Sequence, residues 1–210
     1  MTVIVIYGDF NCPYSYLASL RADRFIAAGL DVEWRAVEHA ASLPVVGRRL
    51  DDAGQRETSE ELDSVRQLLT PEEGFAAATP STLPNTAAAN AGYAEAVGSG
   101  VGDAVRRLLF DAYWKRGTDI GSVDVLRALL AEPIRKGRSS AFPLRESGFA
   151  VSTNRGPITT SAFNRLTTWH RDWVHLATST TPTVVVDGTP YVGVDGLKWL
   201  AANQPRAVAA

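Results

Sequence analysis

The sequence predicts an α/β fold in which a helical block separates two segments that contain strands. Three observations support this class. A β-branched run, a helical segment and an alternating run follow one another within residues 3–37. Apolar residues then recur at helical spacing through the middle of the chain. A helix, a two-strand hairpin and a final helix close the sequence.

The N-terminal residues predict a βαβ unit. Residues 3–7 form a short, uninterrupted β-branched run that is typical of a buried strand. Residues 13–28 begin with a proline, carry apolar side chains at helical spacing and end before Gly29, as a helix does. Residues 30–37 alternate apolar and polar side chains, which predicts a second strand. Strands joined in this way are parallel, with a right-handed crossover.

The middle of the chain is predicted to be helical. Thr58-Ser59-Glu60-Glu61 has the pattern of a capping box and predicts a helix start at that point. Pro84-Asn85-Thr86 begins another helix, and further helices are predicted over residues 101–116 and after Ser122. Residues 132–158 are rich in Pro, Gly, Ser and Arg and are predicted to be irregular.

The C-terminal part predicts a helix, a β-hairpin and a second helix. Residues 161–177 repeat apolar side chains at i, i+3, i+4 spacing. Residues 183–192 contain two strand-like runs around Asp187-Gly188, a two-residue turn sequence. Pro190 cannot donate to a strand ladder, so its strand is expected at a sheet edge. Residues 195–203 are predicted to form the last helix.

Composition argues against several classes of function. The formal net charge of −2 gives no sign of a nucleic-acid partner or an anionic membrane surface. No run approaches the roughly 18 apolar residues of a membrane span, and the N-terminus lacks the features of a signal peptide. We therefore expect a cytoplasmic protein. One cysteine excludes an intramolecular disulfide, and the histidine spacing suggests no metal site.

Cys12, the only cysteine, lies between the first predicted strand and the first predicted helix. Pro13 suits the first helical position, so the thiol sits where unpaired N–H groups and the helix dipole favour a thiolate. One turn along, Ser15 either donates a hydrogen bond to a thiolate or only caps the turn. Cys12 itself is either a reactive, ligand-facing thiol or a small buried hydrophobe. Asp9 is either a solvated turn residue or an anion that raises the thiol pKa.

Three other segments supply further candidates. His39 follows the second strand and is expected at the same rim as Cys12, since parallel strands end at one edge. It is either an acid–base group or a surface residue. Asn85 is either a helix cap or a substrate contact. A basic set is either a solvated loop or a lid that attracts a carboxylate; it comprises Arg135, Lys136, Arg138, Arg145 and Arg155.

The element order and four short motifs resemble the DsbA-like branch of the thioredoxin fold. The motifs are residues 9–17 (DFNCPYSYL), 84–86 (PNT), 110–118 (FDAYWKRGT) and 181–188 (TPTVVVDG). This branch includes DsbA oxidoreductases, kappa-class glutathione transferases and 2-hydroxychromene-2-carboxylate isomerases. The resemblance implies a thioredoxin-like domain of residues 1–40 plus 160–210, with residues 41–159 as an inserted helical domain.

The motif around the cysteine combines features of both groups of relatives. Cys12-Pro13 resembles the start of the DsbA Cys-Pro-x-Cys motif, with Ser15 in place of the second cysteine. Pro13-Tyr14-Ser15-Tyr16-Leu17 resembles the transferase and isomerase motif, with Cys12 at the position of a serine. The resemblance thus implies catalytic roles for Cys12 and Ser15 and ligand contacts for Pro13 and Tyr14.

The resemblance also bears on Thr181-Pro182, which precedes the hairpin. It implies a cis-proline that faces the thiol and leaves the Thr181 backbone free to pair with a peptide-like ligand. The alternative is an ordinary loop proline before a strand.

These observations together predict a monothiol enzyme that acts through mixed disulfides. The alternatives are a kappa-transferase-like or isomerase-like enzyme that uses a small thiol, and a non-catalytic thioredoxin-fold binding module. The implied co-substrate is glutathione or another low-molecular-weight thiol that is not tightly bound, and the implied partner is a small thiol or a disulfide-bearing substrate. Kappa-like relatives also imply a homodimer.

Overall fold

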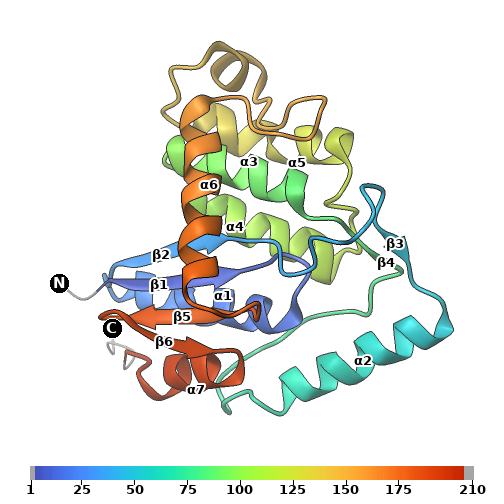
Figure 1. The fold of residues 1–210 in the computed structure, drawn as a ribbon, viewed down its shortest axis with the longest axis vertical. Coiled ribbons are helices and arrows are strands. Elements are labelled where there is room, and N and C mark those ends of the chain that lie inside the picture. Colours follow the sequence, from blue (N-terminus) through green and yellow to red (C-terminus); the bar gives the residue numbers. More distant parts are fainter. Residues whose placement is uncertain (1–2, 206–210) are drawn as a thin grey trace.

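A four-stranded sheet organises the chain, with strand order β2-β1-β5-β6. The computed structural model describes residues 3–205, and Figure 1 shows the arrangement of its elements. Strands β1 and β2 are parallel, whereas β5 pairs antiparallel with both β1 and β6. The sheet strands and the helix that joins the first two are β1 (Ile4–Gly8), α1 (Pro13–Ala27), β2 (Val32–Ala36), β5 (Thr183–Val186) and β6 (Thr189–Val192).

The predicted βαβ unit and hairpin are both confirmed. The β1–β2 register runs from Ile4 opposite Val32 to Gly8 opposite Ala36. The hairpin turn places Asp187 and Gly188 at positive φ, of 47° and 81°. Positive φ at both positions is the conformation of a two-residue turn whose twist matches that of the flanking strands. Pro190 lies on β6, which is an edge strand as expected.

Alternation along β1 directs its side chains to two different layers. Ile4 and Ile6 join the main core with residues of α1 and of α7 (Val194–Ala202). Tyr7 points to the other face, where it packs with Val37 and with Trp173 of α6 (Thr160–His175). Figure 1 shows α6 crossing one face of the sheet and α1 lying behind it.

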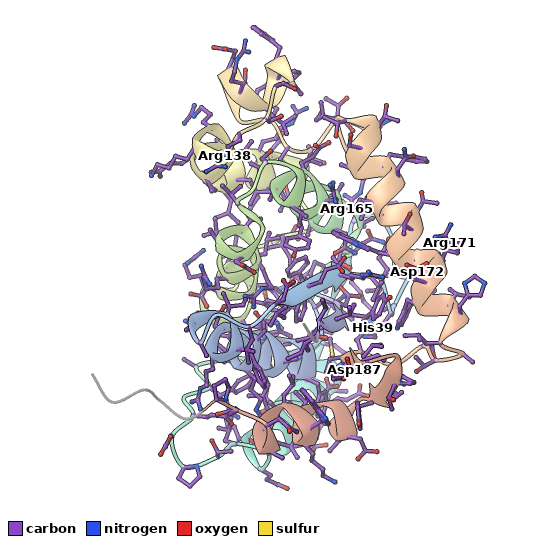
Figure 2. The ribbon with its side chains drawn as sticks, turned by 90° about the vertical axis from the view of Figure 1, so that its left-hand side faces the viewer. His39, Arg138, Arg165, Arg171, Asp172 and Asp187 are labelled. Atoms are coloured by element: carbon purple, nitrogen blue, oxygen red, sulfur yellow. The ribbon has the colours of Figure 1, made fainter. Side chains whose placement is uncertain are left out.

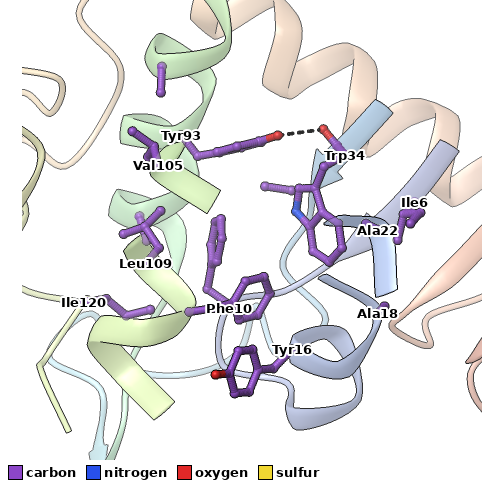
Figure 3. Packing of buried hydrophobic residues seen from close by; sticks show 14 of the residues in the cluster. Ile6, Phe10, Tyr16, Ala18, Ala22, Trp34, Tyr93, Val105, Leu109 and Ile120 are labelled. Atoms are coloured by element: carbon purple, nitrogen blue, oxygen red, sulfur yellow. Dashed lines mark hydrogen bonds between the residues drawn. The ribbon is translucent and has the colours of Figure 1, made fainter. Parts of the chain in front are cut away.

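A helical block extends the core beyond the sheet. Phe10, just after β1, packs against Tyr93, with ring centroids 5.7 Å apart (Figure 3). It also packs against Phe110, with ring centroids 4.9 Å apart. One apolar cluster therefore spans both sides of the predicted boundary between thioredoxin-like part and insertion. The block comprises β3 (Arg48–Arg49), α2 (Asp52–Arg66), β4 (Thr82–Leu83), α3 (Ala87–Gly98), α4 (Gly102–Phe110), α5 (Val123–Lys136) and the π-helical turns Asp111–Lys115 and Pro143–Ser147.

The predicted start of α2 at Thr58 is wrong. The helix begins at Asp52, because the Asp51 carboxylate accepts a hydrogen bond from the Gly54 N–H at 2.8 Å and caps the first turn. Thr58 lies inside the helix, where its hydroxyl donates to the Gly54 carbonyl at 2.9 Å. The residue types of a capping box can also occur inside a helix, so the pattern alone does not locate the helix start.

The prediction of irregular structure over residues 132–158 is wrong at its beginning and near its middle. Helix α5 continues through Pro133 to Lys136, and Pro143–Ser147 forms a π-helical turn. The physical reason for the longer helix is burial, since Leu126, Leu130 and Ile134 form one fully buried stripe at i, i+4, i+8 spacing. That stripe outweighs the hydrogen bond that Pro133 cannot donate.

Glu95 of α3 fixes the start of α6 to the helical block. Its side chain is buried, and its carboxylate accepts hydrogen bonds from the backbone N–H groups of Ile158 and Thr159, at 2.7 Å and 2.6 Å. The Thr159 hydroxyl donates to the second carboxylate oxygen at 2.8 Å. Three donors from one loop thus converge on a single buried side chain.

Replacing Glu95 by alanine is expected to lower the free energy of unfolding by about 3 kcal/mol, because buried donors lose a carboxylate acceptor. Urea denaturation followed by circular dichroism measures this loss. Glu132→Ala serves as a control, since Glu132 makes an exposed ion pair with Lys136, and its midpoint should stay at the wild-type value. Equal midpoints for Glu95→Ala and the wild type would contradict the anchoring role.

Candidate active site

Cys12 occupies the N-cap position of α1, as the sequence predicts. Its backbone is extended, with φ −99° and ψ 121°, and Pro13 takes the first helical position. The Cys12 N–H donates to the Asp9 carbonyl at 3.2 Å, and the Cys12 carbonyl accepts from the Tyr16 N–H at 3.1 Å. The turn between β1 and α1 is thereby closed by hydrogen bonds on both sides of the thiol.

The thiol faces the backbone of Thr181. The Thr181–Pro182 peptide bond is cis, which confirms the expectation. The Cys12 thiol donates to the Thr181 carbonyl oxygen, with Sγ and O 3.4 Å apart. Antiparallel pairing of β1 with β5 sets Tyr7 opposite Thr183 and so brings the two segments together. In this position Cys12 is only 5% exposed.

Burial raises the pKa of the Cys12 thiol above its ordinary value. Hydrogen bonds from the side chain and the backbone N–H of Ser15 act in the opposite direction, and the charge of Asp9 adds to the increase. The net shift is opposite to the expectation of a favoured thiolate at the helix N-terminus, because that expectation took no account of burial. The contact with the Thr181 carbonyl agrees with a protonated thiol, since a carbonyl can only accept.

Asp9 is a buried residue of the site and not a solvated turn residue. One carboxylate oxygen accepts hydrogen bonds from both the backbone N–H and the ring Nδ1 of His39, at 2.9 Å and 2.8 Å. The Asp9 N–H donates to the Ser15 hydroxyl oxygen at 3.2 Å. Burial lowers the pKa of His39, but the hydrogen bond and charge of Asp9 outweigh it, so the net shift is upward. His39 thus reaches the thiol region through Asp9.

A cavity of about 350 Å³ opens beside the start of α1. We call it the polar cavity, and its lining includes Asn11, Pro13, His39, Arg48, Glu57 and Glu61. Asn11 is 4% exposed and donates through Nδ2 to the Pro84 carbonyl at 3.0 Å. Its Oδ1 atom is buried and has no hydrogen-bond partner among residues 3–205. The cavity therefore combines charges of both signs with an unused acceptor.

The structure brings most of the predicted candidates to this corner. Cys12, Ser15, Thr181 and Pro182 meet at the thiol, Pro13 and His39 line the polar cavity, and Asn85 lines a second cavity described below. Tyr14 instead lies beside Glu61 and Ser64 of α2. Sequence reasoning missed Asn11, Glu38 and Arg48. Of these three, only Asn11 and Glu38 could have been suspected from sequence, because they directly precede the candidates Cys12 and His39.

The basic segment does not gather over the site. Arg138 lies far from His39 along the long axis of the molecule (Figure 2). Lys136 and Arg145 make ion pairs with Glu132 and Glu146 on the surface. Arg155 does reach this region, where its guanidinium group donates to the Gly121 carbonyl at 2.8 Å and to Asn85 Oδ1 at 3.2 Å.

The fold and the site define a thioredoxin-fold protein with a thiol at the N-terminus of its first helix, facing a cis-proline loop. The family model described as a DSBA-like thioredoxin domain matches residues 3–133. The chain therefore belongs to the DsbA-like thioredoxin family. A comparison with curated proteins gives no match.

Solved structures share this fold over nearly the whole chain. A probable DsbA oxidoreductase from Streptomyces coelicolor has a TM-score of 0.71 and 14% identity, with 96% of this chain and 88% of that chain covered. A 2-hydroxychromene-2-carboxylate isomerase has a TM-score of 0.66 and 21% identity, with 95% and 93% covered. The cytosolic disulfide reductase DsbM from Pseudomonas aeruginosa has a TM-score of 0.62 and 20% identity, with 95% and 96% covered. Within residues 3–205, no helix has the length and apolar character of a membrane span.

The thiol pKa offers a direct test of the site electrostatics. We expect a Cys12 pKa above the value of about 8.5 for a free cysteine, and thus slower alkylation at pH 7 than in the unfolded protein, since only the thiolate reacts. Asp9→Asn should lower the pKa by removing a nearby negative charge. Ser15→Ala should raise it by removing a hydrogen bond to the thiolate.

The measurement is the rate of iodoacetamide alkylation as a function of pH, followed by intact mass. Thermal unfolding of each variant verifies that the fold is retained. A wild-type pKa at or below the free value, or shifts of the two variants in the same direction, would contradict this account.

Proposed function

We propose that this protein is a monothiol oxidoreductase that exchanges a low-molecular-weight thiol with disulfide substrates through Cys12. The observation that carries the proposal is the position of the Cys12 thiol, at a helix N-terminus and against the carbonyl oxygen of Thr181. A disulfide whose flanking backbone pairs with Thr181 would present a sulfur atom to Cys12. With one cysteine in the chain, the site cannot hold an intramolecular disulfide, so its disulfide chemistry would run through mixed disulfides.

The proposed exchange has two balanced steps. The Cys12 thiol gives up its proton, and the thiolate attacks one sulfur of a mixed disulfide. A bond forms between Cys12 and the small thiol, while the other sulfur leaves as a thiolate and is protonated. A second small thiol then attacks the Cys12 adduct, releasing a small-molecule disulfide and restoring the Cys12 thiolate. The substrate sulfur is reduced to a thiol, and the second small thiol is oxidised as it joins the first in the released disulfide.

Ser15 and His39 support this exchange in different ways. The Ser15 hydroxyl stabilises the Cys12 thiolate by a hydrogen bond. His39 lines the polar cavity, and its pKa is raised by Asp9. In the proposal His39 accepts the thiol proton and returns one to the departing thiolate, which are acid–base roles that an imidazole can perform.

The polar cavity is the proposed place of the small thiol. Arg48 complements a carboxylate, and Glu57 and Glu61 complement an ammonium group, so a small peptide-like thiol such as glutathione suits these charges. Support also comes from a structure titled as DsbM from Pseudomonas aeruginosa with GSH, which has a TM-score of 0.62 and 21% identity. A cytoplasmic location, where small thiols are kept reduced, is part of the same proposal.

A second candidate function rests on the protonation of Cys12. Burial raises the pKa of its thiol, and a protonated S–H group can donate a hydrogen bond to the thiolate of a bound cofactor, as a serine hydroxyl would. The chain would then use a small thiol to isomerise or conjugate a second substrate, without a covalent bond to Cys12. The fold shared with 2-hydroxychromene-2-carboxylate isomerase is compatible with this alternative.

Turnover of a glutathionylated peptide tests the first candidate. The purified protein, with glutathione, glutathione reductase and NADPH, should oxidise NADPH in proportion to peptide reduction. Cys12→Ser should abolish turnover, because a serine hydroxyl forms no mixed disulfide. Ser15→Ala should reduce turnover by about tenfold, since it removes one hydrogen bond to the thiolate.

Ser161→Ala is a matched control on the exposed face of α6 and should keep wild-type turnover. Intact mass should also show a glutathione adduct that is present in the wild type and absent from Cys12→Ser. Full activity of Cys12→Ser would overturn covalent exchange and favour the second candidate.

A further inference from the structure

A second cavity of about 390 Å³ lies between Glu38, α3 and α6. Its walls are mostly apolar, so we call it the apolar cavity. Ala87 and Ala91 contribute from α3, and Leu166 from α6. Val45 and Phe163 also line it, and each is 60% exposed. A cavity of this size, with apolar walls and a few polar groups, is suited to a small organic molecule.

Five polar side chains line the apolar cavity, and four of them make hydrogen bonds within the protein. The five are Glu38, Asn85, Asn154, Arg155 and Thr167. Asn154 Oδ1 accepts from the Gly156 N–H, and the Thr167 hydroxyl donates to the Phe163 carbonyl. Arg155 donates to the Gly121 carbonyl at 2.8 Å and to Asn85 Oδ1 at 3.2 Å. The Asn85 amide in turn donates to the Leu43 carbonyl at 3.1 Å. These bonds tie the loop before α6 to the start of α3, so the basic group has a structural role.

Glu38 differs from the other four polar side chains. It makes no hydrogen bond or ion pair with any of the residues that the structure describes. Burial raises the pKa of its carboxyl, as does the charge of Asp9, while Arg155 acts in the opposite direction. The polar side chain of the apolar cavity that makes no hydrogen bond within residues 3–205 is therefore an acid, which accepts hydrogen bonds and attracts positive charge.

The apolar cavity adjoins the active site through two pairs of neighbouring residues. Glu38 precedes His39, which lines the polar cavity and bonds to Asp9. Asn85 follows Pro84, whose carbonyl accepts from Asn11 next to Cys12. The segment Glu38-His39 thus forms a wall that gives one side chain to each cavity.

We propose that the apolar cavity binds a molecule with an apolar body and an ammonium group, and that Glu38 pairs with the ammonium. A carboxylate placed beside Glu38 is disfavoured, because the two negative charges would repel each other. The role of this molecule as the part of the substrate presented to Cys12 rests on the proposed function. Binding of the molecule does not depend on the proposed function, because Cys12 does not line the apolar cavity.

Calorimetric titration with three probes of similar shape tests the proposal. Phenethylamine carries the ammonium, 3-phenylpropanoate carries a carboxylate, and phenethyl alcohol is neutral. The wild type should bind phenethylamine about tenfold more tightly than phenethyl alcohol, as one charged hydrogen-bonded pair allows. It should bind 3-phenylpropanoate more weakly than either.

Four variants locate the interaction. Glu38→Gln should reduce phenethylamine affinity to that of phenethyl alcohol, whereas Glu60→Gln, an exposed change on α2, should leave it unchanged. Phe163→Ala should weaken the amine and the alcohol by a similar factor. Cys12→Ser should bind phenethylamine like the wild type while losing turnover, so failure of the exchange reaction and failure of this site are distinguishable.

Three outcomes would overturn the proposal. The first is an amine preference that survives in Glu38→Gln. The second is tighter binding of 3-phenylpropanoate than of phenethylamine, which would assign the cavity to anions. The third is no binding of any probe up to its solubility limit.

Discussion

The buried carboxylate of Asp9 is the interaction on which the rest of the site depends. Its side chain holds His39 after β2 through two hydrogen bonds, while its backbone bonds to Ser15 and Cys12 at the start of α1. An unpaired buried carboxylate is strongly unfavourable, so the contact with His39 is needed for Asp9 to lie there. One residue thus fixes the end of β1, the first turn of α1 and the segment after β2 relative to one another.

Topology supplies the remaining half of the site. Parallel pairing brings the carboxyl ends of β1 and β2 to one rim, which places Asp9, Cys12 and His39 together. Antiparallel pairing of β5 with β1 then brings the cis-proline loop to the same rim, where the Thr181 carbonyl meets the thiol. The helical block completes the surroundings, because α2 walls one cavity and α3 with α6 walls the other. The site therefore exists only when both ends of the chain and the middle are folded together.

The parts that could be predicted from sequence are those set by local chemistry. Periodicity, proline and turn residues predict the βαβ unit, the hairpin and Cys12 at a helix N-terminus. Local sequence rules do not show whether Asp51 or Thr58 caps the start of α2. They also do not predict that α5 continues past Pro133 because Ile134 is buried. The upward shift of the Cys12 pKa depends on tertiary burial. The unpaired state of Glu38 depends on where the distant Arg155 side chain bonds. No spacing in the sequence encodes these.

The contact between Cys12 and Thr181 links substrate binding to thiol reactivity in the proposed exchange. As the structure stands, the Thr181 carbonyl accepts from the thiol, and this favours the protonated form. A peptide-like ligand that pairs with the same carbonyl would take that acceptor away. The hydrogen bonds from Ser15, which lower the thiol pKa, would remain. Occupation of the cis-proline loop would therefore shift Cys12 toward the thiolate at the moment a disulfide is in place, and the unliganded thiol would stay buried and slow to react.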